Sequence, residues 1–379
     1  MKKTMTSRER VIAAVEHRET DRVPIDFGMH FSSGISAFAY HDLLEYLGES
    51  TDNIKVSDMV QFLARIDDKI LKMFHSDCKM LYAPWPKEKV WNPRGKYNFR
   101  IPSNLTPVRN EDGDWIISYK GDTIRMPDKG YFFDGGWPWF HPYDFDVYID
   151  ETAKEAEKIY NESEYFTAYH SLGAFFQENP DYLCEMLIDP DNIIRSHESW
   201  LIKETGIIDQ IVKKIGRNIQ GIVLNSDLGT QNGPFCDPLV YEKLSAPFLK
   251  KLCTYIHDNS DYKIILHTCG SIEPMIPILI DCGIDAINPV QISARNMDPK
   301  HLKSAYGDKM TFWGGGCDTQ RILGPGSESE VRANVRELMD IFKKNQGFVF
   351  CQVHNIMGNV PPQNVIAMFD EAYKSGLYD

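Results

Sequence analysis

The alternation of short apolar strands with amphipathic helices, from about residue 150 to the end of the chain, constrains the fold more than any other feature. The expected strands are 165–170, 219–225, 263–267, 286–288, 310–313 and 348–353. Helical spacing follows at 191–214, 238–258, 272–281, 298–305, 328–344 and 363–375. Strands that alternate with helices in this way form a parallel sheet, because each parallel connection needs a crossover of helix length.

Two earlier strands, at 23–28 and 79–83, bring the number of βα units to eight. A helix capped by Thr6 and Glu9 precedes the first of them, and helical spacing recurs at 36–48 and 56–75. Eight units in 379 residues favour a closed (β/α)8 TIM barrel over an open sheet. No Gly-x-Gly-x-x-Gly follows the first strand, so a dinucleotide-binding fold is not favoured.

Residues 85–150 break the alternation. Asp112-Gly113 and Lys120-Gly121 are turn signals between strand-like runs, and this pattern is typical of β-hairpins. We therefore expect one barrel domain over residues 1–379, with an antiparallel β insertion at 85–150 after the second strand. The aromatic stretch 131–140 is interpreted either as a lid or as packing at the base of the insertion.

Composition limits the classes of partner. A formal charge of −13 disfavours nucleic acid and anionic membranes, and no apolar run approaches the roughly 20 residues that span a bilayer. The N-terminus leads into a charged helix and lacks the apolar core of a signal peptide, so we expect a cytoplasmic protein. The 8 cysteines are scattered along the chain, which argues against a disulfide framework.

Polar residues gather where the expected strands end. Barrel enzymes carry their chemistry at the C-terminal ends of the strands and in the loops beyond. The residues at these positions are Asp26, His170, Asp227, His267, Cys269, Asn288, Gln291, Cys317, Asp318, Gln320, Cys351 and His354.

His267 and Cys269 are the strongest candidates for a metal site. Alternate residues of a strand face the same side, so an imidazole and a thiolate at these positions can converge on one ion. That donor pair suits zinc, and Gly270 allows the chain to turn away sharply. A buried histidine beside an inert cysteine is the alternative.

A third ligand is available from later strand ends. His354 is favoured because it lies nearer the loop, with Cys351 interpreted as core and Cys317 as a further alternative. Asp227 is a candidate for handling a proton, or else caps the following segment. The expected catalytic residues are Asp227 and His267, and the expected substrate-binding residues are Asp26, His30, His170, Gln231, Asn288 and Gln291.

Several segments together resemble the uroporphyrinogen decarboxylase superfamily over nearly the whole chain. They are RERVIAAVEHRETDRVPIDFG (8–28), NSDLGTQNGP (225–234), HTCGS (267–271), NPVQ (288–291), WGGGCDTQ (313–320), VHNI (353–356) and VPPQNV (360–365).

This resemblance implies one of two chemistries. One is the metal-free decarboxylase, which grips a polycarboxylate with an Arg-Gln-Ala-Gly-Arg stretch after the first strand. Residues 27–34 read FGMHFSSG at that place and hold no arginine. The other is the zinc-dependent, corrinoid-linked methyltransferases of anaerobes, whose His-x-Cys is matched by His267 and Cys269. His354 stands where the best-known members have a third ligand cysteine, so Cys317 and Cys351 stay open as substitutes.

The resemblance to that second branch implies a methyltransferase of anaerobic one-carbon metabolism. Such a protein would be the demethylating component that moves a methyl group from a small methoxylated or methylated substrate (O-demethylation) to a corrinoid. The corrinoid would be carried by a partner protein, because the chain has no Asp-x-His-x-x-Gly cobalamin motif. The resemblance also implies a homodimer. The alternatives are a decarboxylase without a metal and a binding module on a barrel scaffold.

Overall fold

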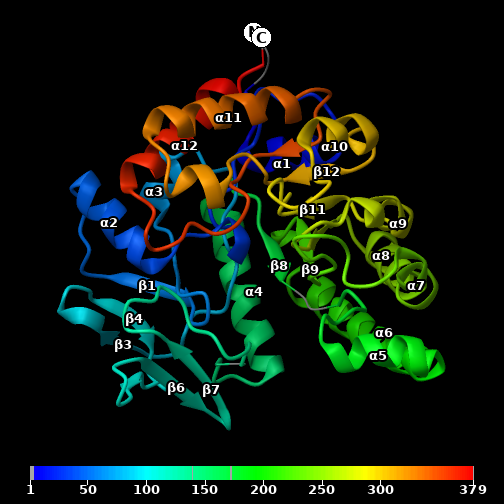
Figure 1. The fold of residues 1–379 in the computed structure, drawn as a ribbon, viewed down its shortest axis with the longest axis horizontal. Helices are drawn as coiled ribbons and strands as arrows, with labels where there is room; N and C mark the ends of the chain where they lie inside the picture. Colours follow the sequence, from blue (N-terminus) through cyan, green and yellow to red (C-terminus); the bar gives the residue numbers. More distant parts are fainter. Residues whose placement is uncertain (1–3, 139, 171–172, 379) are drawn as a thin grey trace.

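The computed structural model describes residues 4–138, 140–170 and 173–378, and its six-stranded sheet is parallel throughout. The strands lie in the order β13-β12-β11-β10-β9-β8. They are β8 (Ala168–His170), β9 (Gly221–Asn225), β10 (Lys263–His267), β11 (Ala286–Asn288), β12 (Thr311–Trp313) and β13 (Phe348–Val349). The expected α/β fold with a mostly parallel sheet is confirmed, and β10 and β11 have the predicted limits (Figure 1).

Helices precede, separate and follow these strands and lie outside the sheet in Figure 1. They are α4 (Phe145–Glu162), α5 (Pro180–Ile188), α6 (Pro190–Lys214), α7 (Pro238–Leu244), α8 (Ala246–Asn259), α9 (Ile276–Cys282), α10 (Pro299–Tyr306), α11 (Glu328–Phe342) and α12 (Pro362–Ser375). The N-terminal region adds α1 (Ser7–Val15), α2 (Ala37–Leu47) and α3 (Asp68–Met73). At α1 the Thr6 hydroxyl accepts from Glu9 N–H and the Glu9 side chain accepts from Thr6 N–H, which is the expected capping box.

Alternation along the strands separates two cores. In β10, Ile264 and Leu266 pack in the larger apolar cluster, whereas Ile265 belongs to a smaller one with Val223 and Val349 from other strands. Because side chains alternate between faces, His267 shares the face of Ile265. The smaller cluster therefore lies directly beneath the residues that end the strands on this face.

Two extended segments flank the parallel sheet. Near residue 25, Asp26 N–H donates to Phe350 O at 2.8 Å, and near residue 78, Lys79 N–H donates to Phe166 O at 3.0 Å. Asp77 N–H donates to Ile25 O at 2.7 Å and joins the two segments. The expected strands 23–28 and 79–83 were wrong as regular strands. The first is reduced to a single bridge at Ile25, and the second contains no bridge, because the bridge nearest to it lies at Cys78. Pro24 lacks an N–H, which removes one ladder bond from the first segment.

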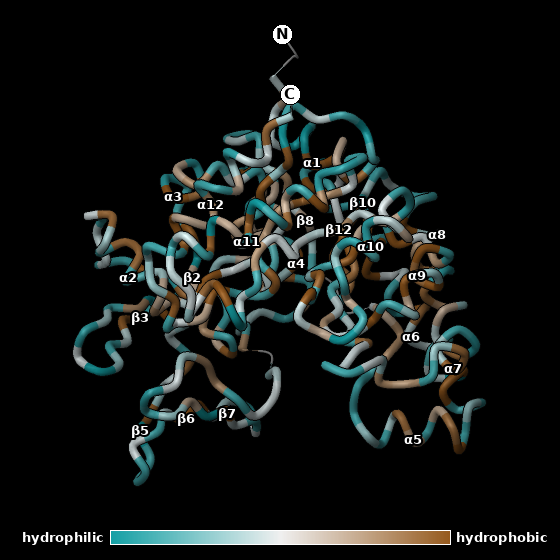
Figure 2. The backbone as a smooth tube through the Cα atoms, turned by 45° about the horizontal axis from the view of Figure 1, so that its top comes forward, coloured by the Kyte–Doolittle hydropathy of each residue, from teal (hydrophilic) through white to brown (hydrophobic). Residues whose placement is uncertain are grey.

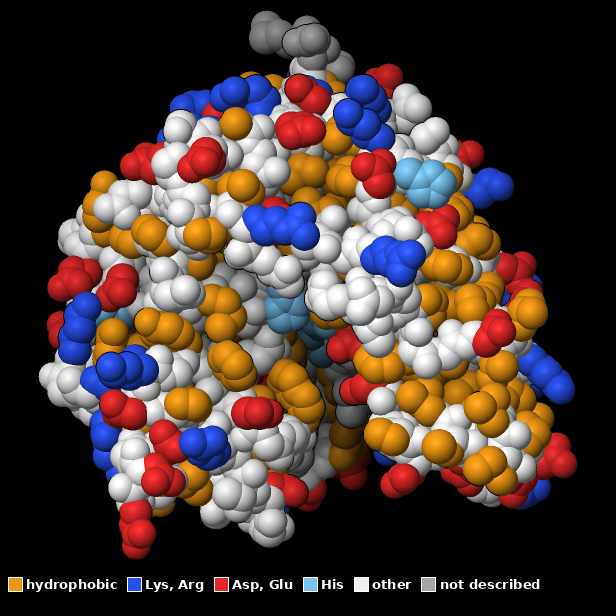
Figure 3. All heavy atoms as spheres, viewed as in Figure 1, with side chains coloured by type: hydrophobic (Ala, Val, Ile, Leu, Met, Phe, Trp, Pro, Cys, Tyr) orange, Lys and Arg blue, Asp and Glu red, His pale blue; other side chains and the backbone are white. Residues whose placement is uncertain are grey.

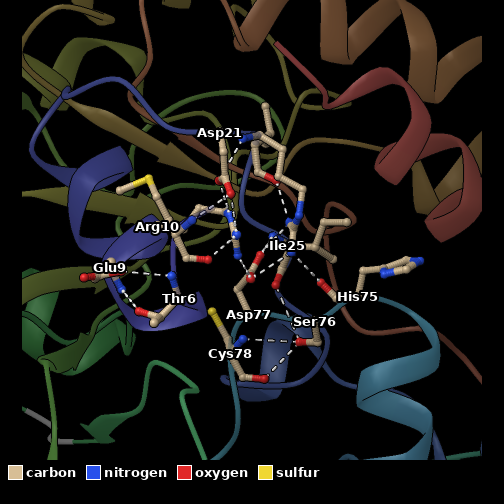
Figure 4. A network of polar contacts seen from close by, with 12 residues as sticks. Thr6, Glu9, Arg10, Asp21, Ile25, His75, Ser76, Asp77 and Cys78 are labelled. Carbon is tan, nitrogen blue, oxygen red and sulfur yellow. Dashed lines mark hydrogen bonds and ion pairs between the residues drawn. The ribbon is translucent and has the colours of Figure 1, made fainter. Parts of the chain in front are cut away.

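A buried charge network fixes these segments to α1 (Figure 4). Arg10 contacts both Asp21 and Asp77 at 2.6 Å, and Arg22 contacts Asp77 at 2.7 Å. The Asp77 carboxylate also accepts from Ile25 N–H at 2.9 Å. Two guanidinium groups thus compensate the charge of a fully buried carboxylate, which would otherwise be costly to desolvate.

Antiparallel pairing dominates the region between residues 54 and 126. A four-stranded sheet has the order β2-β1-β4-β3, with β1 (Ile54–Asp58), β2 (Leu63–Ala64), β3 (Glu88–Trp91) and β4 (Phe99–Pro102). A second sheet contains β5 (Val108–Arg109), β6 (Trp115–Tyr119) and β7 (Asp122–Met126), and β6 and β7 form the hairpin expected at Lys120-Gly121. The helical prediction for 56–75 was wrong except at α3, because pairing of β1 with β2 and β4 overrides an apolar spacing that also suits a helix.

In Figure 2, many hydrophilic residues (teal) lie on the outer turns of the molecule, whereas many hydrophobic residues (brown) lie in its interior. Among the helices of the described residues, none combines the length and apolar character needed to cross a membrane.

Candidate metal centre

Four polar side chains end strands of the parallel sheet on the face of the smaller core. His170, Asn225, His267 and Asn288 are the last residues of β8, β9, β10 and β11. In the register, His267 lies between Asn225 and Asn288. Figure 3 shows histidine side chains, in pale blue, exposed in a hollow at the centre of this side of the molecule.

His267, Cys269 and His354 converge in this region. Each offers one ligand atom, and the three atoms lie within 4.8 Å of one another. Sγ of Cys269 is 3.7 Å from Nε2 of His267. The spacing fits a single ion bound by two nitrogens and one sulfur, with a small inward movement to bonding distance.

Asn288 determines which nitrogen of His267 is available. Nδ2 of Asn288 donates to Trp313 O at 3.3 Å, so its Oδ1 faces the imidazole. That oxygen is 3.2 Å from Nδ1 of His267 and also accepts from Ser32 Oγ at 2.5 Å. Nδ1 of His267 is therefore the donor, and Nε2 keeps its lone pair for a metal.

Asn355 does the same for His354. Its Nδ2 donates to Gln61 Oε1 at 3.1 Å, which turns its Oδ1 toward Nδ1 of His354 at 2.6 Å. Nε2 of His354 is then the free acceptor. Both imidazoles thus present the same nitrogen, each held by an asparagine whose amide is oriented by another carbonyl.

The loop after β10 is shaped to bring Cys269 beside His267. Cys269 N–H donates to Oδ1 of Asp227 at 2.8 Å, and Gly270 N–H donates to Gln291 at 2.7 Å. Gly270 has φ +90°, and a Cβ there would collide with the backbone oxygen of Gly229. Only glycine fits this turn.

Burial controls the protonation of the cluster. It lowers the pKa of His267 and of His354, so both imidazoles are neutral at physiological pH. It raises the pKa of the Cys269 thiol well above its usual value, and the Asp227 carboxylate raises it further. Without a cation the thiol keeps its proton, and a bound metal would displace it.

Asp227 is the acidic residue next to the three ligands. Its Oδ1 is 3.9 Å from Nε2 of His267, and its side chain is 40% exposed. The carboxylate therefore reaches both the metal position and solvent, as a residue that handles a proton must.

Two further histidines extend the cluster. The ring of His30 lies 4.5 Å from that of His267, and the ring of His170 stacks on His30 at 5.1 Å and 5°. His30 is held by Asn225 at 3.0 Å and Ser32 at 2.9 Å. Burial, then the neighbouring His267 and His170, lower the pKa of His30.

Other predicted site residues lie outside this cluster. Asp26 is fully buried, and its oxygens accept from Trp313 Nε1 and Met29 N–H at 2.8 Å. Burial raises the pKa of Asp26 to about 6. Gln291 supports the turn at Gly270, and Gln231 is exposed, with its backbone oxygen accepting from Arg295 N–H.

The substitute cysteine ligands are both fully buried. Cys317 packs in the larger apolar cluster and Cys351 in the smaller one. Burial raises the pKa of each thiol. Among the described residues, the group of possible ligands that includes His267 contains neither of them.

Sequence reasoning missed the supporting residues. Ser32, Gln61 and Asn355 each orient an amide or imidazole at the centre. Ser32 and Gln61 lie in segments that the sequence does not mark as strand ends. Only the folded structure shows that they lie at the centre. Asn355 follows His354 directly, and an amide beside a ligand histidine was the available signal.

The comparisons with known proteins concern the family and the fold. Residues 222–375 match the family model of uroporphyrinogen decarboxylase (URO-D). The matched residues make up less than half of the chain. The match runs from β9 to α12 and so includes Asp227, His267, Cys269 and His354. The expected resemblance to the URO-D superfamily is confirmed over these residues. No curated protein matches the sequence.

One solved structure shares the fold beyond the URO-D region. A methyltransferase from Methanosarcina mazei is 15% identical, with 98% of this chain and 99% of that chain covered at a TM-score of 0.51. A GH10 endoxylanase from a sugarcane soil metagenome is 12% identical over 62% of this chain and 82% of that chain, at a TM-score of 0.36. At these identities the first likeness shows a common fold, and the second carries no argument.

Proposed function

We propose that this protein is a methyltransferase that moves a methyl group from a small methoxylated or methylated substrate to a corrinoid held by a partner protein. The observation that carries the proposal is the convergence of His267, Cys269 and His354, with ligand atoms within 4.8 Å, at strand ends of a URO-D fold. The methyltransferase from Methanosarcina mazei supports it through its fold.

The donor set fits zinc. Two imidazole nitrogens and one sulfur are ligands that zinc prefers, and three protein ligands leave a fourth position for substrate, as in catalytic zinc sites. The lone pairs of both imidazoles are already aimed by Asn288 and Asn355. When bound, zinc would polarise the substrate heteroatom and make it a better leaving group.

The chain's own residues would complete the reaction. His267 and His354 are partly buried, which limits the water on the ligand side of the centre and strengthens electrostatic interactions there. Asp227, close to the metal position and open to solvent, would deliver a proton to the departing heteroatom. The hollow in Figure 3 would admit substrate and the corrinoid of the partner.

Closure of the barrel and the antiparallel insertion belong to the same proposal. The hydrogen bonds that join residues 24–26 to residue 350, directly after β13, residue 77 to residue 25, and residues 77–79 to residue 166 support a closed (β/α)8 barrel. The antiparallel strands β3 to β7 support the insertion at 85–150. Closure would place all strand ends around one mouth.

Methyl transfer is tested with purified protein, zinc, reduced cobalamin as the methyl acceptor and methoxyarenes as donors. We expect methylcobalamin to form and the Cys269→Ala variant to lose both zinc and activity. The decarboxylase alternative is measured in parallel with uroporphyrinogen. Consumption of uroporphyrinogen by metal-free protein, with no methyl transfer from any methyl donor, would overturn the proposal.

A further inference from the structure

An exposed apolar surface lies on α5 and at the start of α7. Leu187 and Ile188 of α5 are 72% and 82% exposed, and Leu239 of α7 is 71% exposed. The two helices lie side by side in Figures 1 and 2, and Figure 3 shows hydrophobic side chains gathered over this lobe, at the lower right. We call the surface of Leu187, Ile188 and Leu239 the α5 face. Exposed apolar side chains that gather in this way mark interaction sites.

The α5 face lies beside the hollow that contains the metal centre. α5 follows β8, whose last residue is His170, and the connecting segment is attached to the end of β9. There, Ser226 Oγ donates to Phe176 O at 3.1 Å, and Ser226 directly precedes Asp227. In Figure 3, the lobe that carries α5 forms one wall of the hollow. A protein that approaches the centre therefore meets this lobe.

Tyr182 holds α5 against α6. Its hydroxyl donates to Nε2 of His197 at 2.9 Å, because Nδ1 of His197 donates to Leu244 O at 3.0 Å. The ring of Tyr182 also packs against Phe176, with ring centroids 5.8 Å apart, and both Tyr182 and His197 are buried. The inner side of α5 is thus fixed, and the α5 face is presented to solvent in one orientation. A preorganised surface lowers the entropic cost of docking.

Acidic residues surround the α5 face. Residues 177–191 contain five of them, Glu178, Asp181, Glu185, Asp189 and Asp191, and no lysine or arginine. The whole chain has 54 acidic and 41 basic residues, so the imbalance in this segment is local and does not follow from composition alone. Charge complementarity therefore requires a partner whose own apolar contacts are surrounded by basic side chains.

The same charge argues against other occupants of the α5 face. A two-fold interface between two copies of this chain would place the same patch on both sides, so the acidic residues of 177–191 would face one another and repel. Nucleic acid and anionic membranes are negative and would be repelled as well. In the proposed reaction the methyl acceptor is held by another protein, which has to contact the walls of the hollow to reach the centre. That protein is the occupant that position and charge favour.

We propose that the α5 face docks the corrinoid carrier, and that the docking surface of the carrier consists of apolar side chains surrounded by lysine and arginine. The proposal rests on the methyl transfer proposed above and names the surface and the chemistry of its protein partner. Apolar contacts of Leu187 and Ile188 stabilise the complex, whereas the acidic side chains accelerate its association.

The probe for the apolar contacts is the corrinoid-binding protein of the cells that produce this chain, purified by the visible absorbance of its cobalt centre. Surface plasmon resonance measures its binding to the full chain. We expect the double variant Leu187→Ser/Ile188→Ser to weaken the complex about tenfold, mainly through faster dissociation. Met73→Ser, at an exposed apolar position that ends α3, is the matched control and should bind as wild type does.

The acidic residues are tested through the rate of association at low and at high salt. Glu178→Lys/Asp181→Lys should slow association about tenfold at low salt and make it less dependent on salt, because long-range attraction is lost. Asp258→Lys/Asp261→Lys is the matched control. Both of its positions are exposed and lie just before β10, at the end of that strand opposite His267, so association should change much less. Urea unfolding checks that every variant keeps the fold.

Other results overturn the inference. If the carrier does not bind, or binds both double variants of the α5 face as it binds wild type, docking does not use this surface. A dimer that Leu187→Ser/Ile188→Ser converts to a monomer in sedimentation would assign the α5 face to a second copy. Methyl transfer to free reduced cobalamin is measured separately in wild type. Transfer to free cobalamin with unaffected docking removes this inference alone, whereas docking at the α5 face without methyl transfer to either acceptor defeats the proposed function alone.

Discussion

Oδ1 of Asn288 lies 3.2 Å from Nδ1 of His267, and the amide is oriented by its own donation to Trp313 O. The relationship fixes the tautomer of a histidine that sits beside a cysteine thiol. It also explains why a fully buried amide stands at the end of β11, where an apolar side chain would otherwise pack.

Asn288→Ala should therefore weaken zinc binding by about 10- to 100-fold, because His267 loses the partner that aims Nε2. Competition with a fluorescent zinc chelator measures the affinity. Asn355→Ala should have the same effect through His354, and the exposed Asn53→Ala is the matched control. Unchanged affinity in both variants would show that the asparagines do not orient ligands.

Substitutions at Cys269 and Cys351 should distinguish a metal ligand from a residue that only packs in the core. Cys269→Ala removes a ligand and should abolish stoichiometric zinc binding with little effect on unfolding. Cys351→Ala leaves a cavity in the smaller core, so we expect it to retain zinc and lose on the order of 1 kcal/mol of stability. Metal analysis and urea unfolding of both variants check this, and zinc loss in Cys351→Ala would reassign the third ligand.

Gly270→Ala should destabilise the protein by about 3 kcal/mol, because the new Cβ would meet the backbone of Gly229 and φ is +90°. Gly206→Ala is the matched control. Gly206 lies within α6, and an added methyl group there would point into open space, so that substitution should stabilise the helix by about 1 kcal/mol. Thermal unfolding measures both, and similar values for the two variants would contradict the account of the turn.

The buried charge network of Arg10, Asp21 and Asp77 should make the free energy of unfolding depend on pH. Burial on its own would raise the pKa of Asp21, but hydrogen bonds from Arg10 and from Met5 N–H lower it to about 2. A carboxyl with a lowered pKa stabilises the fold above its unfolded pKa near 4, and this stabilisation disappears as the pH falls toward 2. Asp21→Asn should thus cost about 2 kcal/mol at pH 7 and much less at pH 2.5.

Urea unfolding of wild type and Asp21→Asn between pH 2.5 and pH 7 checks this dependence. Asp112→Asn, at an exposed position, serves as the control and should show no such difference. A constant difference between wild type and Asp21→Asn over the whole pH range would show that packing, and not charge, determines the effect.

The parallel half of the fold was predictable because its strands are fully buried apolar runs with helices between them. β10 begins and ends where the sequence indicates, and its alternation placed His267 and Cys269 on one side. The early strands were not predictable in detail. In residues 56–75 the spacing of apolar residues fits either a helix or a strand. Pairing of β1 with β4, which is distant in sequence, favours the strand.

The candidate centre was predictable only as a set of strand ends. The preference for His354 over Cys351 rested on nearness to the loop, and the structure brings His354, not Cys351, beside His267. The aromatic stretch 131–140 divides in a way that no local pattern indicates. Phe133 and Phe140 pack in the core, whereas Trp137 is exposed, and Trp139 lies outside the described residues.

Zinc K-edge X-ray absorption of the loaded protein tests the central claim most directly. With His267, Cys269 and His354 as ligands, we expect about one zinc per chain, with one sulfur near 2.3 Å and two imidazole nitrogens near 2.0 Å. The sulfur should vanish in Cys269→Ala. A chain that binds no zinc, or a zinc shell of oxygen alone, would contradict the account.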